Sequence, residues 1–197
     1  MIKLTPEILG ILSVVFAALS YPPYLISMLK GKIKPHVFSW ALWSLLTFIA
    51  FAIQLASGAG PGAWTTGFSA VCTTIIAVVA IRYGERNITR SDWLAFAGGL
   101  LAIPLWLGMK NPTAAAILVT AIDAAGFYPT FRKSWHKPRE ELLYMNLITM
   151  MKHFLSLAAL TVFSIPTALF PATLMTLNIL LAAMITGRRL ALKQRLS

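Results

Sequence analysis

Three residues stand out chemically in this sequence, because they are ionisable and lie inside long apolar segments. Asp123 lies near the middle of the apolar run 113–131, and Lys152 and His153 lie near the middle of the run 140–164. A central Asp or Lys costs about 2.5–3.5 kcal/mol on insertion scales, so such groups are normally paired or line a wet cavity. Consecutive antiparallel helices would bring Asp123 and Lys152 to similar depth, where they could form a structural ion pair or part of a solute site.

The segment that carries Lys152 also carries a polar stripe. Its members recur at spacings of three, four and seven and so share one broad helix face: Asn146, Thr149, Lys152, His153 and Ser156. A polar stripe in a membrane helix faces the protein interior. Asn178 lies at similar depth in the run 168–186, so we expect it to face the same place.

The predicted site is one-sided, since Asp123, Lys152 and Asn178 all belong to the second half of the chain. A central ammonium favours a carboxylate or phosphate on the ligand, and a nearby carboxylate could hold an amine or exchange a proton. We therefore predict a small anionic or zwitterionic metabolite as the ligand. Proton coupling, with His153 as a further carrier, is left open, and Trp43 could stack on a flat part of the ligand.

The chain that positions these residues has the composition of a membrane protein. Hydrophobic residues make up 58% of the 197 residues and charged residues 12%, about half the charged share of an ordinary soluble domain. A spanning helix needs about 20 apolar residues. Seven candidate runs are present: 8–29, 37–57, 64–82, 93–109, 113–131, 140–164 and 168–186. The sequence thus predicts an all-α membrane protein with seven transmembrane helices.

The basic residues set the predicted orientation. Fourteen of the 17 Lys and Arg residues fall on one side of the seven runs, two fall on the other side, and Lys152 lies within a run. By the positive-inside rule the N-terminus is outside and the C-terminus is cytoplasmic. Tryptophans near the run ends fit interfacial belts: Trp64 and Trp106 outside, and Trp40, Trp93 and Trp135 inside. We expect a multi-pass protein of the plasma membrane, or of the inner membrane in a bacterium.

The net charge of +11 does not indicate a nucleic-acid-binding protein. The cationic residues sit in short clusters at the ends of apolar runs and form no continuous basic face that could lie along a duplex. Their expected partner is the lipid bilayer.

An internal repeat divides the chain. Tyr21-Pro22-Pro23-Tyr24 near the end of the first run matches Tyr128-Pro129-Thr130-Phe131 near the end of the fifth, and each is followed by a basic loop and two further runs. We predict a three-helix repeat over 1–84, a linker helix over 85–112, and a second three-helix repeat with a basic tail over 113–197. The single intervening helix makes the repeats parallel. Pro22 and Pro129 interrupt helical hydrogen bonding, so each is a candidate hinge, with a static bend as the alternative.

In these features the chain resembles the PQ-loop and SWEET-like transporter superfamily. The resemblance rests on the three-one-three layout, on the prolines Pro22 and Pro129, and on the stretch 21–58, in which a proline and a basic loop precede Phe38-Ser39. The pair Trp40 and Trp43 is similar to that of vitamin-precursor transporters with the same architecture.

The resemblance implies alternating access through a midplane site between two triple-helix bundles. It also implies that Asn178 corresponds to an asparagine that lines the site in the seventh helix of the sugar transporters. A small-molecule substrate is then the expected partner.

Other functions have less support in the sequence. There is no metal-binding His pair, no usable Ser/His/Asp arrangement and no Gly-rich phosphate loop, so we expect neither an enzyme, nor a bound metal, nor a cofactor. Cys72, the single cysteine, lies in an apolar run and is expected to be a small buried hydrophobe. A seven-helix receptor without transport, and a sugar or vitamin-precursor facilitator, are the alternatives. Homo-oligomerisation is left open.

Overall fold

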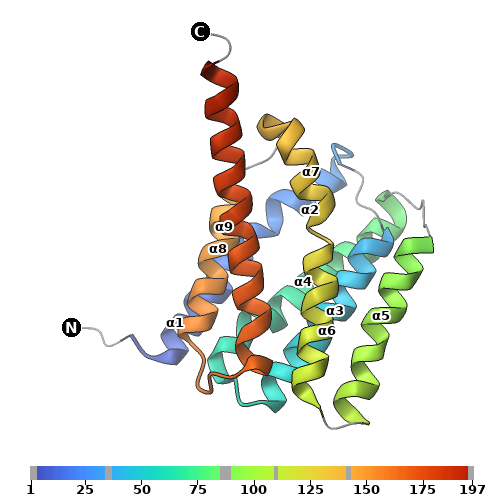
Figure 1. Ribbon diagram of the computed structural model, residues 1–197, viewed down its shortest axis with the longest axis vertical. Coiled ribbons are helices and arrows are strands. Elements are labelled where there is room, and N and C mark those ends of the chain that lie inside the picture. The colour runs from blue at the N-terminus through green and yellow to red at the C-terminus, as the bar shows by residue number, and fades with distance from the viewer. Residues whose placement is uncertain (1–3, 34–36, 85–89, 109–110, 141–142, 195–197) are drawn as a thin grey trace.

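The computed structural model describes residues 4–33, 37–84, 90–108, 111–140 and 143–194, and within these ranges the protein is all-helical (Figure 1). The described α-helices are α1 (Pro6–Ser20), α2 (Pro22–Leu29), α3 (Val37–Ala56), α4 (Trp64–Tyr83), α5 (Arg90–Leu107), α6 (Pro112–Ala125), α7 (Tyr128–His136), α8 (Leu143–Ala158) and α9 (Ile165–Gln194). Short 3-10 helices, η1 (Gly60–Ala63) and η2 (Pro138–Glu140), lie in two of the connections. The predicted all-α class is confirmed.

Two of the predicted spans are each divided into two helices next to the predicted prolines. α1 is capped by Thr5 and ends at Ser20, and α2 begins at Pro22 after the single residue Tyr21. α6 is capped in the same way by Asn111, and α7 follows it with Pro129 in its first turn. A proline in the first turn of a helix removes an amide that would have no helical partner anyway, so each second helix starts there at little cost. Whether either break is a moving hinge stays a prediction.

Five helical segments are long and apolar enough to cross a membrane, judged by length and composition within the described residues: Pro6–Leu29, Val37–Ala56, Gly60–Tyr83, Pro112–His136 and Ile165–Lys193. Large apolar side chains also cover their outer faces, such as Val15, which is 47% exposed, and Val78, which is 60% exposed. A water-soluble surface would not carry so many. These are the features of a multi-pass membrane protein.

Several helix boundaries differ from the predicted runs. α8 has 16 residues, fewer than the run 140–164, because residues 159–164 leave the helix and pair with the η1 loop, where Thr161 N donates to Ala59 O at 3.2 Å. The basic segments 132–136 and 187–194, which we predicted as loop and tail, are helical. They support each other, since Arg188 Nε donates to Trp135 O at 3.0 Å and its guanidinium lies 4.5 Å from the Trp135 ring centroid.

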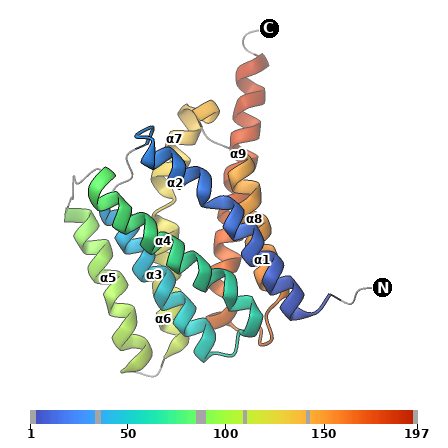
Figure 2. The same cartoon turned by 180° about the vertical axis from the view of Figure 1, so that it is seen from behind.

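The helices pack as two similar triplets. In the first triplet, α4 packs against both α1 and α3, and in the second triplet, α9 packs against both α6 and α8. The triplets meet mainly where α1 contacts α8 and where α3 contacts α6, while α5 lies outside against α3 and α6 (Figures 1 and 2). Exchanging α1 with α6, α3 with α8 and α4 with α9 reproduces this set of main contacts.

At one end of the bundle the triplets are joined by hydrogen bonds, which we call the η1 seam. Gln54 Nε2 donates to Thr167 O at 3.2 Å, Ser156 Oγ donates to Gly62 O at 2.6 Å, and the Thr161 hydroxyl donates to the Gly58 carbonyl at 2.6 Å. Packing at the seam is tight, because a Cβ on Gly62 would lie 2.8 Å from the Ser156 carbonyl oxygen.

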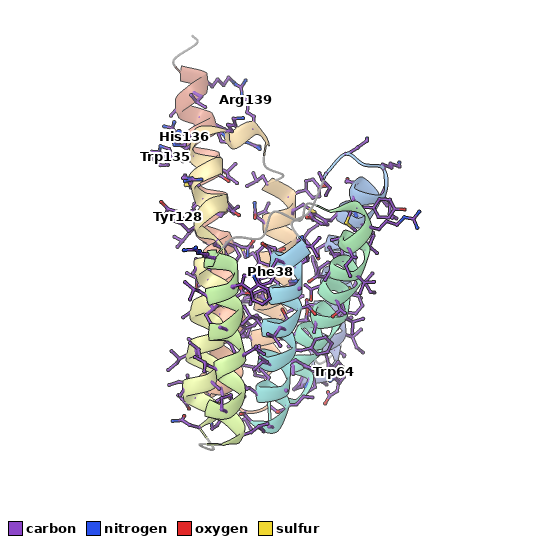
Figure 3. All side chains as sticks on the ribbon, turned by 90° about the vertical axis from the view of Figure 1, so that its right-hand side faces the viewer. Phe38, Trp64, Tyr128, Trp135, His136 and Arg139 are labelled. Atoms are coloured by element: carbon purple, nitrogen blue, oxygen red, sulfur yellow. The ribbon has the colours of Figure 1, made fainter. Side chains whose placement is uncertain are left out.

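Exposed tryptophans lie toward both ends of the bundle. Trp64 is 40% exposed near η1, and Trp135 is 49% exposed on α7 toward the opposite end (Figure 3). This is the arrangement expected of side chains at two membrane interfaces. Trp40, by contrast, is half-buried on α3.

Candidate functional site

A cavity of about 270 Å³ lies between the two triplets, beside both helix breaks. Pockets for drug-sized ligands typically measure about 300–1,000 Å³. The cavity is slightly smaller than these pockets, so its size suits a small metabolite. Nine lining residues come from the first triplet and nine from the second: Ser20, Tyr21, Tyr24, Trp40, Trp43, Thr47, Thr66, Ser69, Thr73, Asp123, Phe127, Met145, Thr149, Lys152, His153, Phe170, Leu174 and Asn178.

Lys152 reaches from α8 toward the first triplet. It is 6% exposed, its Nζ donates to Ser69 Oγ on α4 at 3.2 Å, and the same nitrogen lies 5.2 Å from the centroid of the Tyr21 ring. Tyr21 is the residue at the α1–α2 break. The ammonium is therefore held by a hydroxyl and an aromatic face, both from the opposite triplet.

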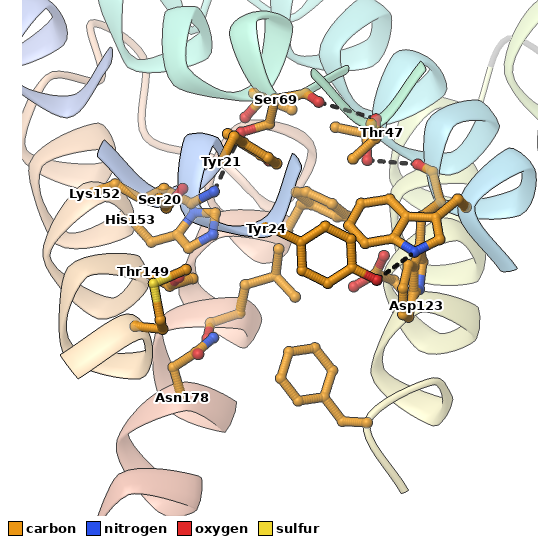
Figure 4. Close-up of a pocket in the computed structure, with 18 residues that line it drawn as sticks. Ser20, Tyr21, Tyr24, Thr47, Ser69, Asp123, Thr149, Lys152, His153 and Asn178 are labelled. Atoms are coloured by element: carbon orange, nitrogen blue, oxygen red, sulfur yellow. Dashed lines mark hydrogen bonds between the residues drawn. The ribbon is translucent and has the colours of Figure 1, made fainter. Parts of the chain in front are cut away.

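Asp123 lies in the last turn of α6, on the other side of the cavity from Lys152 in the view of Figure 4. It is 6% exposed, and within the described parts of the chain its carboxylate forms neither a hydrogen bond nor an ion pair. Lys152 attracts it electrostatically without pairing directly with it. The described residues therefore do not form the structural ion pair that was one of the two alternatives for Asp123 and Lys152.

The expected direct approach of Asp123 and Lys152 fails for a topological reason. Their helices, α6 and α8, both pack against α9, which lies between them. Consecutive spans in the chain are therefore not neighbours in this part of the bundle, and the two side chains meet only through the cavity.

His153 and Asn178 add polar groups beside Lys152. His153 is 3% exposed, and its Nδ1 has no partner among the described residues. Asn178 Nδ2 donates to Leu174 O at 2.8 Å, one turn earlier in α9. That bond occupies one amide hydrogen and leaves the side-chain carbonyl oxygen for a ligand.

Aromatic side chains form the wall near the α2 end. Trp40 Nε1 donates to the Tyr24 hydroxyl at 3.1 Å, and the Trp40 ring meets the Trp43 ring edge-on at 5.3 Å between centroids. Trp43 also lies against the second triplet, because a Cβ on Gly126 would come within 3.2 Å of Trp43 Nε1. Trp40 therefore lies on the cavity wall, held by a hydrogen bond and by edge-on ring packing. Its role as an anchor at the membrane interface stays a prediction.

The cavity gathers six of the seven binding residues expected from the sequence: Trp43, Asp123, Thr149, Lys152, His153 and Asn178. Asn146 is half-buried on α8 and is not among the lining residues. Whether the six bind a solute stays a prediction.

Sequence reasoning missed a set of hydroxyls in the first triplet. Thr66, Ser69 and Thr73 are all buried and line the cavity from α4. Their spacings of three and four place them on one helix face, so the same stripe argument could have found them. Polar side chains therefore line the cavity from both halves of the chain, whereas the buried charges Asp123 and Lys152 both come from the second half.

Comparisons with known proteins add no family to this description. Among the described residues, no group of three His, Cys, Asp or Glu side chains is placed to hold a metal ion. No protein-family model, no curated protein and no solved structure matches the chain.

Proposed function

We propose that the protein is a membrane transporter that moves a small polar metabolite, anionic or zwitterionic, by alternating access. The proposal has seven spans, formed by α1/α2, α3, α4, α5, α6/α7, α8 and α9, with the N-terminus outside and the C-terminus inside. The first and second triplets are parallel repeats, and α5 links them.

The observation that carries the proposal is the pair of buried charges around one cavity between the triplets. Asp123 and Lys152 come from different helices, are each 6% exposed, and line the cavity without pairing with each other. Ionisable groups at such depth are expensive and in membrane proteins typically mark a solute or ion pathway. A purely structural role would favour a direct pair.

The interrupted helices support the same proposal. Ser20 and Tyr21 line the cavity at the α1–α2 break, and Phe127 lines it at the α6–α7 break. Transporters commonly bind solutes where spanning helices are discontinuous near the interface of two repeats. Here each triplet contributes one such break.

The unequal ends of the bundle fit one state of an alternating cycle. At the η1 seam the triplets are joined across their interface by Gln54, Ser156 and Thr161. At the opposite end, the hydrogen bonds from Trp40 to Tyr24 and from Arg188 to Trp135 each stay within one triplet. A transport cycle would break the seam and form contacts at the α7 end.

Flux through sealed proteoliposomes tests the proposal. Labelled amino acids, organic acids, sugars and vitamin precursors are offered to vesicles that contain the wild-type protein, Lys152→Met or Lys30→Met. We expect uptake of a charged member of the panel, loss of that uptake in Lys152→Met, and retention in Lys30→Met, which removes the same charge from an exposed position. Ligand binding without any flux would indicate a receptor instead.

A further inference from the structure

The two ends of the cavity carry opposite charges, and the described residues give neither charge a full set of partners. A buried ion without compensation is destabilising, so the ligand-free cavity is an unfavourable environment for both groups. The chemistry of each end indicates what would compensate it.

The Lys152 end is suited to an acidic group. An ammonium has three donors, and the described residues occupy one of them, with Ser69 Oγ. Thr66, one turn before Ser69 on the same helix, is 1% exposed, and its hydroxyl has no hydrogen-bond partner among the described residues. An ammonium and a hydroxyl can both donate hydrogen bonds to a carboxylate.

The Asp123 end is suited to a cationic nitrogen. Its carboxylate is buried without a donor from the described residues, and Phe127 lines the cavity one turn further along. Trp43 borders the same turn through its close approach to Gly126, whose amide donates to the Asp123 carbonyl at 3.0 Å. A carboxylate flanked by aromatic rings attracts a cation by charge and by the ring quadrupoles.

We infer that the cavity binds a small zwitterion, with its acidic group at Lys152 and Ser69 and its amine at Asp123 beside Trp43. This inference rests on the proposed role of the cavity as the solute site. A simple anion would compensate Lys152 and leave Asp123 uncompensated, and a simple cation would do the reverse. Only a ligand with both charges satisfies both ends, and its small size fits a cavity of about 270 Å³.

Equilibrium binding to the purified full chain in lipid nanodiscs tests the ligand class without requiring transport. The probes are the straight-chain ω-amino acids from glycine to 6-aminohexanoate, each compared with the acid of equal length that lacks the amine and the amine that lacks the acid. We expect at least one chain length to bind about tenfold more tightly than both of its singly charged analogues. An analogue that binds as well as every zwitterion would overturn the inference, as would the absence of binding by all the zwitterions.

Two variants test which end of the cavity binds the acidic group and which end binds the amine. Asp123→Asn should weaken binding of the zwitterion about tenfold or more and leave binding of the matching acid unchanged or tighter. Lys152→Gln should weaken the zwitterion similarly and spare the matching amine. Glu7→Gln and Lys30→Met remove the same charges from exposed positions and should change neither. Equal effects of Asp123→Asn on zwitterion and acid would overturn the assignment.

The binding and flux experiments fail independently. Selective zwitterion binding with no vesicle uptake would contradict transport and leave the ligand class standing. Uptake of an acid that binds better than any zwitterion would support transport and contradict the ligand class.

Discussion

The hydrogen bond between Lys152 and Ser69 gives a quantitative prediction about stability. Ser69→Ala removes the hydroxyl that accepts from Lys152 Nζ at 3.2 Å, and leaves the buried ammonium without a hydrogen-bond acceptor from the described residues, next to the Tyr21 ring. Hydrogen bonds to charged groups contribute about 1.5–3 kcal/mol, whereas interhelical hydrogen bonds in a membrane average about 0.6 kcal/mol. For a buried, charge-assisted bond we expect a loss of about 1.5 kcal/mol in the free energy of unfolding.

Thr66→Val is the matched control. Thr66 lies on the same face of α4, also lines the cavity and is also buried, but its hydroxyl has no partner among the described residues. Removing an unsatisfied buried hydroxyl while keeping the shape should be neutral or stabilising. The two substitutions thus change similar groups at similar depth with opposite expected outcomes.

The assay is reversible denaturant unfolding of the full chain in mixed micelles, performed as a double-mutant cycle with Lys152→Met. Ser69→Ala should cost little once Lys152 is already replaced, because the ammonium that donates to the hydroxyl is then gone, and the coupling free energy should be about 1–2 kcal/mol. Additive effects of the two substitutions, or equal destabilisation by Ser69→Ala and Thr66→Val, would refute the reasoning.

Three further predictions use other parts of the structure. Asp123→Asn should raise the thermal midpoint of the ligand-free protein, because an amide of the same shape replaces a buried carboxylate that receives no hydrogen bond from the described residues; a lower midpoint contradicts this. Gly62→Ala should destabilise the protein by about 1–3 kcal/mol, because the new methyl would lie 2.8 Å from the Ser156 backbone oxygen across the η1 seam, whereas Gly187→Ala enters open space and should not destabilise. Pro22→Ala should slow vesicle flux with ligand binding retained if the α1–α2 break moves during transport; unchanged flux would indicate a static bend.

The sequence predicted the fold well where composition and covalent restriction decide the structure. Apolar runs of about 20 residues predicted an all-helical chain, and prolines predicted the two breaks, because both signals are local. The number of seven spans stays a proposal, since five helical segments are long and apolar enough to cross a membrane within the described residues. Residues 159–164 were misassigned because they are apolar but not helical. Their backbone pairs with the η1 loop, about 100 residues earlier, and no local pattern reports such a partner.

The candidate site was predictable only in part, because charged side chains are much less favourable in an apolar segment than hydroxyls and therefore stand out more clearly. Asp123 and Lys152 were conspicuous because buried charges are rare in apolar segments. The α4 hydroxyls were less conspicuous, because Ser and Thr are common in apolar helices, where the helix backbone can accept their hydroxyl hydrogen. Thr73 is an example, since its Oγ1 donates to the Ser69 carbonyl at 2.9 Å, one turn earlier. Because α9 packs between α6 and α8, Lys152 on α8 lies away from Asp123 on α6 and donates its hydrogen bond to Ser69 instead. The order of the helices in the chain does not reveal this packing.

Thiol labelling of the cavity tests the central claim most directly, namely that solute passes through the space between the triplets. Thr149→Cys in a Cys72→Ser background places a single thiol on the cavity wall, and the reporter is flux of whichever solute the vesicle panel identifies. We predict that a small polar thiol reagent abolishes flux and that bound solute slows the labelling. Complete labelling with unchanged flux, or labelling that the solute does not slow, would contradict the account.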